Sequence, residues 1–194
     1  MKSDIILAGV GGQGILSIAT VIGSAALQEG LYLKQAEVHG MSQRGGDVQS
    51  NLRLSSEPIC SDLIPKGGAD LIVSLEPMEA LRYLPYLAPD GWIITNTAPF
   101  VNIPDYPEMD KLMAELDRLP HVVALDVDTL AKDLGNPRGA NMVLLGAMAA
   151  VLHILEPEAL REGIRRIFAR KGEVIVDNNI KAFDAGLAFS QNRQ

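Results

Sequence analysis

Six residues near the start of the chain, Gly9-Val-Gly-Gly-Gln-Gly14, match the pattern G-x-G-x-x-G. In nucleotide-binding folds the first glycine permits a tight turn, the second lets a pyrophosphate approach the backbone, and the third lets the helix pack on the strand. Free N–H groups at the helix start then face the anion. Glu37 follows Gly14 by 23 residues, near the spacing expected for an acid that contacts a ribose hydroxyl. A tight strand-to-helix turn without any ligand would also explain these glycines.

A second polar cluster lies at residues 37–46, which read EVHGMSQRGG. Its Arg44 offers a planar guanidinium suited to carboxylate or phosphate, and Ser42 and Gln43 add neutral hydrogen-bonding groups. The glycines around them let a ligand or another chain come close. The alternative is an ordinary surface loop in which Arg44 pairs with Glu37 or Asp47. The candidate binding residues are therefore Gly9, Gly11, Gly12, Gln13, Gly14, Ser42, Gln43 and Arg44, and no catalytic residue is assigned.

Both candidate segments follow predicted strands. Residues 4–8 form a short apolar run, and from residue 15 to about residue 28 apolar side chains recur at helical spacing. Residues 31–36 are a second strand, which gives a βαβ-sized opening with parallel strands and a right-handed crossover. Open α/β sheets bind ligands beyond the carboxyl ends of their strands. We therefore expect the two loops to lie at the same edge of the sheet.

The rest of the chain predicts a Rossmann-like, doubly wound, mostly parallel α/β sheet. Residues 48–54, a turn and Ile59-Cys60 indicate an inserted hairpin. From about 140 to 190 the pattern is helical, and residues 141–155 are apolar on nearly all sides, so this helix is buried. No linker divides the sequence, so residues 1–194 are predicted to form a single domain. Strands are also expected over 70–75, 92–96 and 122–125, and helices over 77–83, 109–119 and 127–134.

Composition excludes several function classes. Cys60 is the only cysteine, so this chain alone can form neither an internal disulfide nor a four-thiolate iron–sulfur cluster, and a reducing, cytoplasmic compartment is expected. The formal charge of −7 disfavours a nucleic-acid or anionic-membrane binder. The longest apolar run has 11 residues, whereas a spanning helix needs about 20. The start lacks the layout of a signal peptide, and so few histidines disfavour a metal site.

Three segments resemble the gamma-type domain of the 2-oxoacid:ferredoxin oxidoreductases. They are the glycine loop at 9–14, the EVHGMSQRGG segment at 37–46 and Ser-Asn-Leu-Arg at 50–53. The segments DLIVSLEP at 70–77 and GNPRGAN at 135–141 are similar too, so the resemblance covers most of the chain. Within this family the residues look most like the small beta subunit of the indolepyruvate-type enzymes, and EVHGMSQRGG is the most specific part.

The resemblance implies one subunit of a divided enzyme that decarboxylates aryl pyruvates oxidatively to acyl-coenzyme A. It implies a larger partner that carries thiamine diphosphate and iron–sulfur clusters and passes electrons to ferredoxin. Coenzyme A is the co-substrate implied for this chain, near the glycine loop and residues 42–44. The chain shows no GDG…NN thiamine signature, since Asn178-Asn179 follow no such motif. We therefore expect it to be inactive alone.

Two other functions stay open at this point. The chain could be a stand-alone Rossmann-type module that binds NAD or an acyl nucleotide as a sensor. It could also be a purely structural subunit that uses the EVHGMSQRGG segment as an interface.

Overall fold

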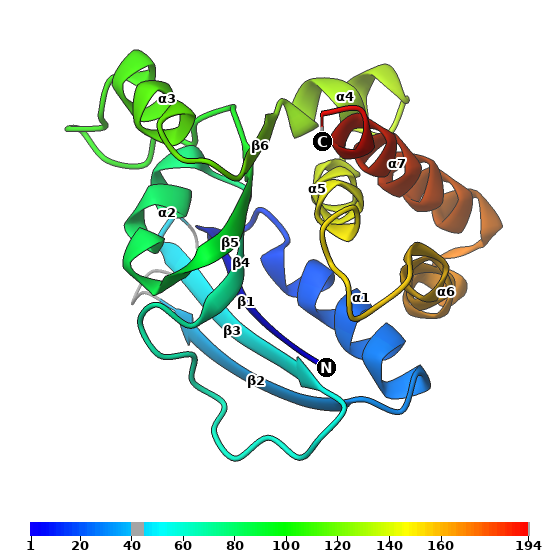
Figure 1. The fold of residues 1–194 in the computed structure, drawn as a ribbon. Helices are drawn as coiled ribbons and strands as arrows, with labels where there is room; N and C mark the ends of the chain where they lie inside the picture. The colour runs from blue at the N-terminus through cyan, green and yellow to red at the C-terminus, as the bar shows by residue number, and fades with distance from the viewer. Residues whose placement is uncertain (40–44, 194) are drawn as a thin grey trace.

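The computed structural model describes residues 1–39 and 45–193, in which a six-stranded sheet separates two layers of helices (Figure 1). The strand order is β2-β3-β1-β4-β5-β6. The strands are β1 (Lys2–Val10), β2 (Tyr32–His39), β3 (Asp47–Ser55), β4 (Ala69–Ser74), β5 (Leu87–Asn96) and β6 (Val122–Leu125). The helices are α1 (Ile15–Gln28), α2 (Pro77–Arg82), α3 (Met109–Asp117), α4 (Val127–Asp133), α5 (Ala140–Ala149), α6 (Pro157–Phe168) and α7 (Glu173–Gln191).

The predicted α/β class is confirmed, and four neighbouring strands, β1, β4, β5 and β6, pair in parallel. The strand order differs from the expected βαβ opening at β3. This strand pairs antiparallel with β1 on one side and with β2 on the other, so β1 and β2 run in the same direction without touching. The helix between them, α1, therefore crosses over one inserted strand.

The expected hairpin of residues 48–54 with Ile59-Cys60 is wrong. The antiparallel hairpin is formed by β2 and β3, and residues 56–68 form a loop. β3 pairs with β1 on one side and with β2 on the other, so no edge of it remains for Ile59-Cys60. The guanidinium of Arg53 instead holds the loop, donating to the carbonyls of Ser61 and Leu63, both at 3.1 Å. The same guanidinium forms two hydrogen bonds to the buried carboxylate of Asp4 on β1. Nε donates to Oδ1 at 2.7 Å, and Nη2 donates to Oδ2 at 3.0 Å. The carbonyls of Ser61 and Leu63 thus accept hydrogen bonds from the Arg53 side chain and not from a neighbouring strand.

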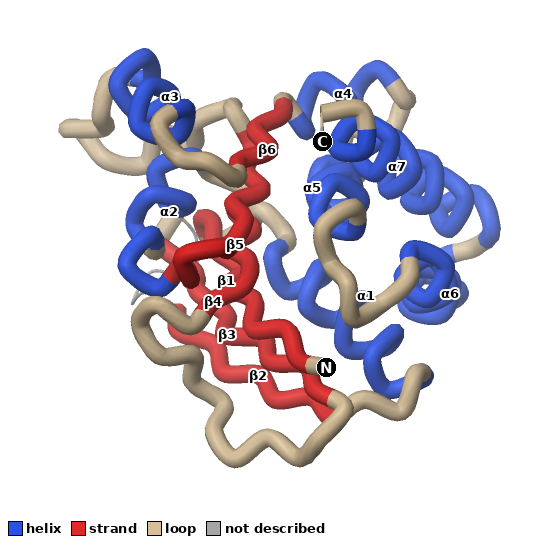
Figure 2. The backbone as a smooth tube through the Cα atoms, viewed as in Figure 1, coloured by secondary structure: helices blue, strands red, loops and turns tan. Residues whose placement is uncertain are grey.

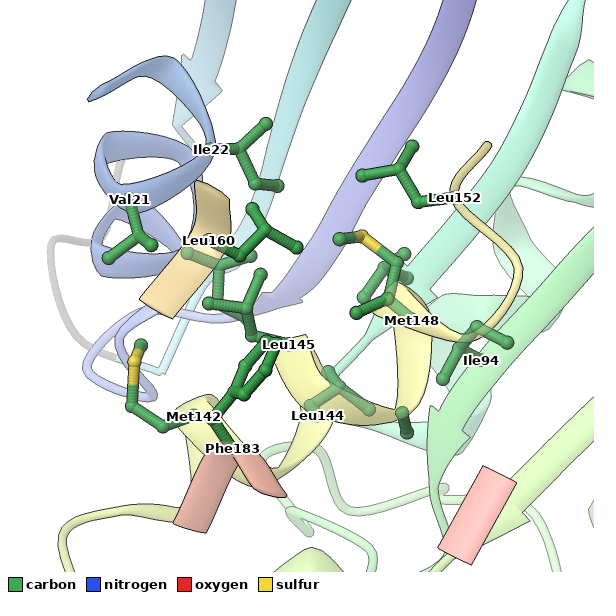
Figure 3. Packing of buried hydrophobic residues seen from close by; sticks show 14 of the residues in the cluster. Val21, Ile22, Ile94, Met142, Leu144, Leu145, Met148, Leu152, Leu160 and Phe183 are labelled. Atoms are coloured by element: carbon green, nitrogen blue, oxygen red, sulfur yellow. The ribbon is translucent and has the colours of Figure 1, made fainter. Parts of the chain in front are cut away.

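Alternate residues of the strands enter two separate cores. Ile5 and Leu7 of β1 face the larger core, which packs under α1, α5, α6 and α7 (Figure 3). Ile6 and Ala8 face the smaller core, under α2 and α3. Figure 2 shows the sheet between these two groups of helices, as a doubly wound fold requires.

The helical C-terminal part is confirmed, although its first helix is shorter than the pattern predicts. Helix α5 ends at Ala149, whereas Val151, Leu152 and Leu155 stay buried in the following loop. Apolarity there signals burial, which a loop packed on the core can also provide. In the described ranges, none of the helices combines the length and the apolar character that crossing a membrane would require.

Candidate functional site

The glycine loop connects the carboxyl end of β1 to the start of α1, as the motif predicts. Gly14 caps α1 at φ +88°, a left-handed conformation that favours glycine. A Cβ at Gly14 would also lie 2.7 Å from Nδ2 of Asn141, which belongs to α5. Asn141 donates from Nδ2 to the Gly14 carbonyl at 3.3 Å. The loop is thus held against the start of α5, 127 residues away.

Gln13 holds the glycine loop in place through two hydrogen bonds to the backbone, so its side chain does not project toward a ligand. Its Oε1 accepts from the N–H of Val10 at 2.7 Å, and its Nε2 donates to the carbonyl of Leu75 at 3.0 Å. The N–H of Gly11 donates to the Gly46 carbonyl at 2.8 Å. The N–H groups of Gly12 and Gly14 have no partner among the described residues, so these two can face an anion.

The two predicted segments do meet at one edge of the sheet. Gly11 bonds Gly46 through its N–H, and the N–H of Gly45 donates back to the Gly11 carbonyl at 3.4 Å. The last two residues of the EVHGMSQRGG cluster therefore lie against the glycine loop. Ser42, Gln43 and Arg44 themselves lie outside the described residues, and their roles remain predictions.

Glu37 does not have the placement of a ribose-binding acid. It lies on β2 opposite Ser50 of β3, and β3 separates it from β1. Its Oε1 accepts from Nε2 of Gln35 at 2.5 Å. Neighbouring strands are about 4.8 Å apart, so the inserted strand moves Glu37 roughly 5 Å further from the glycine loop than in a βαβ dinucleotide fold.

A polar hollow of about 460 Å³ opens beside the glycine loop, beyond the carboxyl ends of the parallel strands. Its wall carries a chain of hydrogen bonds: Asn96 donates from Nδ2 to the Leu75 carbonyl at 3.3 Å and to Asp128 Oδ2 at 2.9 Å. This is the edge where open α/β sheets bind ligands. The hollow is lined by Gly12, Gln13, Gly14, Leu75, Asn96, Asp128, Pro137, Arg138, Ala140 and Asn141.

Arg138 gives the hollow a cation that the sequence interpretation did not single out. Its exposed guanidinium has no ion-pair partner among the described residues. Two helix starts, those of α1 and α5, border the same hollow and contribute the positive ends of their dipoles. The sequence signal that could have identified Arg138 was the segment GNPRGAN, which belongs to the resemblance. It follows a short helix, whereas the two candidate segments both follow predicted strands. The arrangement suits an anionic group such as a phosphate.

A buried carboxylate lies behind the hollow, in the segment after β4. Glu76 is fully buried and caps α2 by accepting from the N–H of Glu79 at 2.8 Å. Its other oxygen accepts from the N–H of Phe100 at 3.4 Å and from the hydroxyl of Tyr106. Burial and the bond to Glu76 raise the pKa of Tyr106, so this hydroxyl stays protonated and donates. Glu76 therefore ties β4, α2 and residues 97–106 together.

His121 and Cys60 do not line the hollow. His121 stacks on Trp92 with ring centroids 4.9 Å apart, and Cys60 is exposed in the loop after β3. Within residues 1–39 and 45–193, no three His, Cys, Asp or Glu side chains form a group that could hold a metal ion.

Known proteins resemble the chain over nearly its whole length. The family model described as pyruvate ferredoxin/flavodoxin oxidoreductase matches residues 4–189. Indolepyruvate oxidoreductase subunit IorB of Archaeoglobus fulgidus is 36% identical over 194 residues, covering 96% of this chain and 94% of that protein. The subunit of the same name from Thermococcus kodakarensis is 38% identical over 193 residues, covering 95% and 94%.

Solved structures with the same fold come from related enzymes. The gamma subunit of a keto/oxoacid ferredoxin oxidoreductase from Geobacter sulfurreducens superposes with a TM-score of 0.71 at 25% identity, over 98% of this chain and 99% of that one. A 2-oxoglutarate:ferredoxin oxidoreductase from Magnetococcus marinus, solved with 2-oxoglutarate, coenzyme A and succinyl-CoA bound, has a TM-score of 0.77 at 23% identity. That match covers 98% of this chain and 31% of the other chain.

Proposed function

Since the chain belongs to the pyruvate ferredoxin/flavodoxin oxidoreductase family, we propose that it is the small subunit of an indolepyruvate-type 2-oxoacid:ferredoxin oxidoreductase. The similarity to two IorB subunits over about 95% of the chain is the observation that carries the proposal. The reaction converts an aryl pyruvate, coenzyme A and two oxidised ferredoxins into acyl-coenzyme A, carbon dioxide, two reduced ferredoxins and a proton. The reducing cytoplasm is the compartment that suits it.

The division of labour follows from what this chain lacks. Its single cysteine cannot hold a four-thiolate cluster, and it has no thiamine signature. Thiamine diphosphate and the iron–sulfur clusters therefore belong to a larger partner subunit, which carries out the decarboxylation and passes electrons to ferredoxin. This chain completes the active-site cleft.

The hollow beside the glycine loop fits the anionic part of coenzyme A. Arg138, the free N–H groups of Gly12 and Gly14 and the start of α5 would hold a phosphate, and Asn141 positions the loop. Ser42, Gln43 and Arg44, whose roles rest on the sequence alone, would add polar and cationic contacts. Coenzyme A supplies the thiol that accepts the acyl group.

Reconstitution tests the proposed function directly. The partner subunit together with this chain should reduce ferredoxin with indolepyruvate and coenzyme A, whereas the partner alone should show no turnover. Full activity of the partner alone would contradict the proposal.

The Arg138→Gln variant tests the hollow within the assembled enzyme. We expect the KM for coenzyme A to rise about tenfold or more, because a charge-assisted hydrogen bond to phosphate contributes roughly 1.5–3 kcal/mol. The KM for the 2-oxoacid should stay unchanged. Arg170→Gln is the matched control, since Arg170 is equally exposed and lies outside the hollow. An unchanged KM for coenzyme A in Arg138→Gln would place the phosphate elsewhere.

A stand-alone NAD-binding sensor is the alternative. The strand inserted between β1 and β2, which separates Glu37 from the glycine loop, argues against it. Titration of the purified chain with NAD and with coenzyme A distinguishes the two readings, because only a bound ligand raises the melting temperature.

A further inference from the structure

Residues 97–106, the loop between β5 and α3, present three large apolar side chains to solvent. Phe100, Val101 and Ile103 are 42%, 67% and 41% exposed. They fall within four successive positions, whereas most exposed apolar residues of this chain occur singly. In Figure 1 this segment leaves the end of β5 and passes beside α2 to reach α3. Clustered exposed apolar residues mark interaction sites more often than scattered ones do.

The loop is anchored at four points in spite of this exposure. Asn96 at the end of β5 accepts from the N–H of Ala98 at 3.2 Å, and the N–H of Thr97 donates to the Leu125 carbonyl at 3.0 Å. Further along, the buried carboxylate of Glu76 accepts from the N–H of Phe100 and the hydroxyl of Tyr106. Asn102 donates from Nδ2 to the Gly45 carbonyl at 2.8 Å. The apolar side chains are thus presented in one arrangement, which lowers the entropy cost of binding.

The loop also connects the two halves of the candidate site. It begins at Asn96, which lines the hollow, and reaches Gly45, the described residue next to Ser42–Arg44. A partner that closes the hollow at this edge would therefore meet the loop.

Charge around the loop indicates what kind of surface it meets. Residues 97–110 contain three carboxylates, Asp105, Glu108 and Asp110, and no lysine or arginine. Asp105 and Asp110 are exposed without an ion pair among the described residues, while Glu108 pairs with Lys111. An apolar centre with an acidic rim is complementary to an apolar patch rimmed by lysine or arginine.

We propose that residues 97–106 are the docking element by which this chain binds the thiamine-bearing partner subunit, with Phe100, Val101 and Ile103 seated in an apolar patch that has a basic rim. The inference rests on the proposed function. It is supported by the continuity of the loop with the hollow that the partner must close.

The test compares a triple serine variant of the loop with a serine change at an exposed valine elsewhere. The variant Phe100→Ser/Val101→Ser/Ile103→Ser should bind the partner subunit at least tenfold more weakly, measured by calorimetric titration of the two full chains. Phe100 and Ile103 are more than half buried, so a modest fall in melting temperature is expected, and far-UV circular dichroism must show the variant folded at the titration temperature. Val174→Ser is the control, since Val174 is 71% exposed on α7 and far from residues 97–106 in the sequence. It should bind the partner as the wild type does.

A second variant tests the contribution of the acidic rim. Asp105→Lys should lower the association rate at low salt by severalfold, and added salt should remove the difference. If the wild type binds the partner and both loop variants bind it equally well, the docking element is wrong and the proposed function stands. If the wild type does not bind the partner at all, the proposed function itself fails. A wild-type homodimer that the triple variant converts to monomer would also overturn the inference, because the loop would then bind a second copy.

Discussion

At the scale of single residues, the polar groups under the carboxyl edge of the sheet mostly serve the fold. Gln13 holds the glycine loop to β4, Asn96 joins β4 to α4, and Glu76 holds residues 97–106. Each is a buried or half-buried group whose partners come from a different element. Losing one partner would leave the others unsatisfied, which costs about 1–3 kcal/mol. Arg138 differs, since it lines the same hollow without an ion pair in the described part of the chain.

Glu79 makes stability depend on pH. Its side chain is 1% exposed, and burial raises its pKa above the ordinary 4.5 even though Arg82 lowers it in part. Above pH 4.5 the folded state therefore keeps this proton over a range where the unfolded chain has lost it, and stability falls as pH rises through that range. In Glu79→Gln this contribution disappears, so the variant should gain stability relative to wild type as pH increases from 4 to about 7.

Urea unfolding at several pH values measures this difference. Glu115→Gln is the control, because Glu115 forms an exposed i,i+3 pair with Arg118 of the same kind as the buried Glu79–Arg82 pair. The stability difference between Glu79→Gln and wild type should change with pH more than that between Glu115→Gln and wild type. If the stability difference between Glu79→Gln and wild type changes with pH no more than that of Glu115→Gln, then Glu79 does not titrate differently in the folded state.

At the scale of elements, the crossing of α5 and α7 is the closest helix contact in the described part of the chain. A Cβ on Gly146 would lie 1.8 Å from the Phe183 carbonyl oxygen, and a Cβ on Gly186 would lie 1.8 Å from that of Val143. The two glycines thus face each other's helix, and the backbones touch. Phe183 and Met142 fill the space beside this contact in the larger core (Figure 3).

Alanine at either glycine should separate the two helices. We expect Gly146→Ala and Gly186→Ala each to lower the free energy of unfolding by about 3 kcal/mol or more, at the upper end of overpacking costs, because a rigid backbone rather than a side chain must move. Gly23→Ala on α1 is the control. Its Cβ would meet only the flexible end of Leu33 at 3.2 Å, so the helix propensity gain of up to ~1 kcal/mol should make it neutral or stabilising. Chemical denaturation measures all three, and neutral values at the crossing would contradict the contact.

At the scale of the whole molecule, the sheet joins the two cores into one unit. β1, β4 and β5 each contribute residues to both, and α5, α6 and α7 pack on the same larger core as α1. The C-terminal helices therefore have no separate core of their own. We therefore propose, as the sequence predicts, that residues 1–194 form a single domain.

A single domain should unfold in one transition. Trp92, the only tryptophan, lies on β5 and stacks on His121, whereas far-UV circular dichroism is dominated by the helices. We expect the two signals to give the same urea midpoint and the same slope. The far-UV signal would change at lower urea than Trp92 fluorescence if residues 140–190 unfolded independently, and the single-domain prediction would then be wrong.

The sequence by itself determined the features that depend on local periodicity and on short motifs. Helix α1 and strand β6 have the bounds that the pattern predicts, because apolar spacing and a flanking glycine or aspartate act within a few residues. The glycine loop and residues 37–46 indicated the family and the edge of the sheet where the candidate site lies. The two segments meet there, through Gly11 of the first and Gly46 of the second.

Only the tertiary structure decided the position of β3 and the composition of the hollow. A strand's own residues show which of its faces is buried, but not which two strands it pairs with, because pairing depends on contacts between segments far apart in the chain. The hollow likewise combines Gly14, Asn96, Asp128 and Arg138, which lie on four separate segments. Arg138 lies in the GNPRGAN segment of the resemblance, but it becomes a candidate only because folding brings it beside the glycine loop, at the end of the parallel strands.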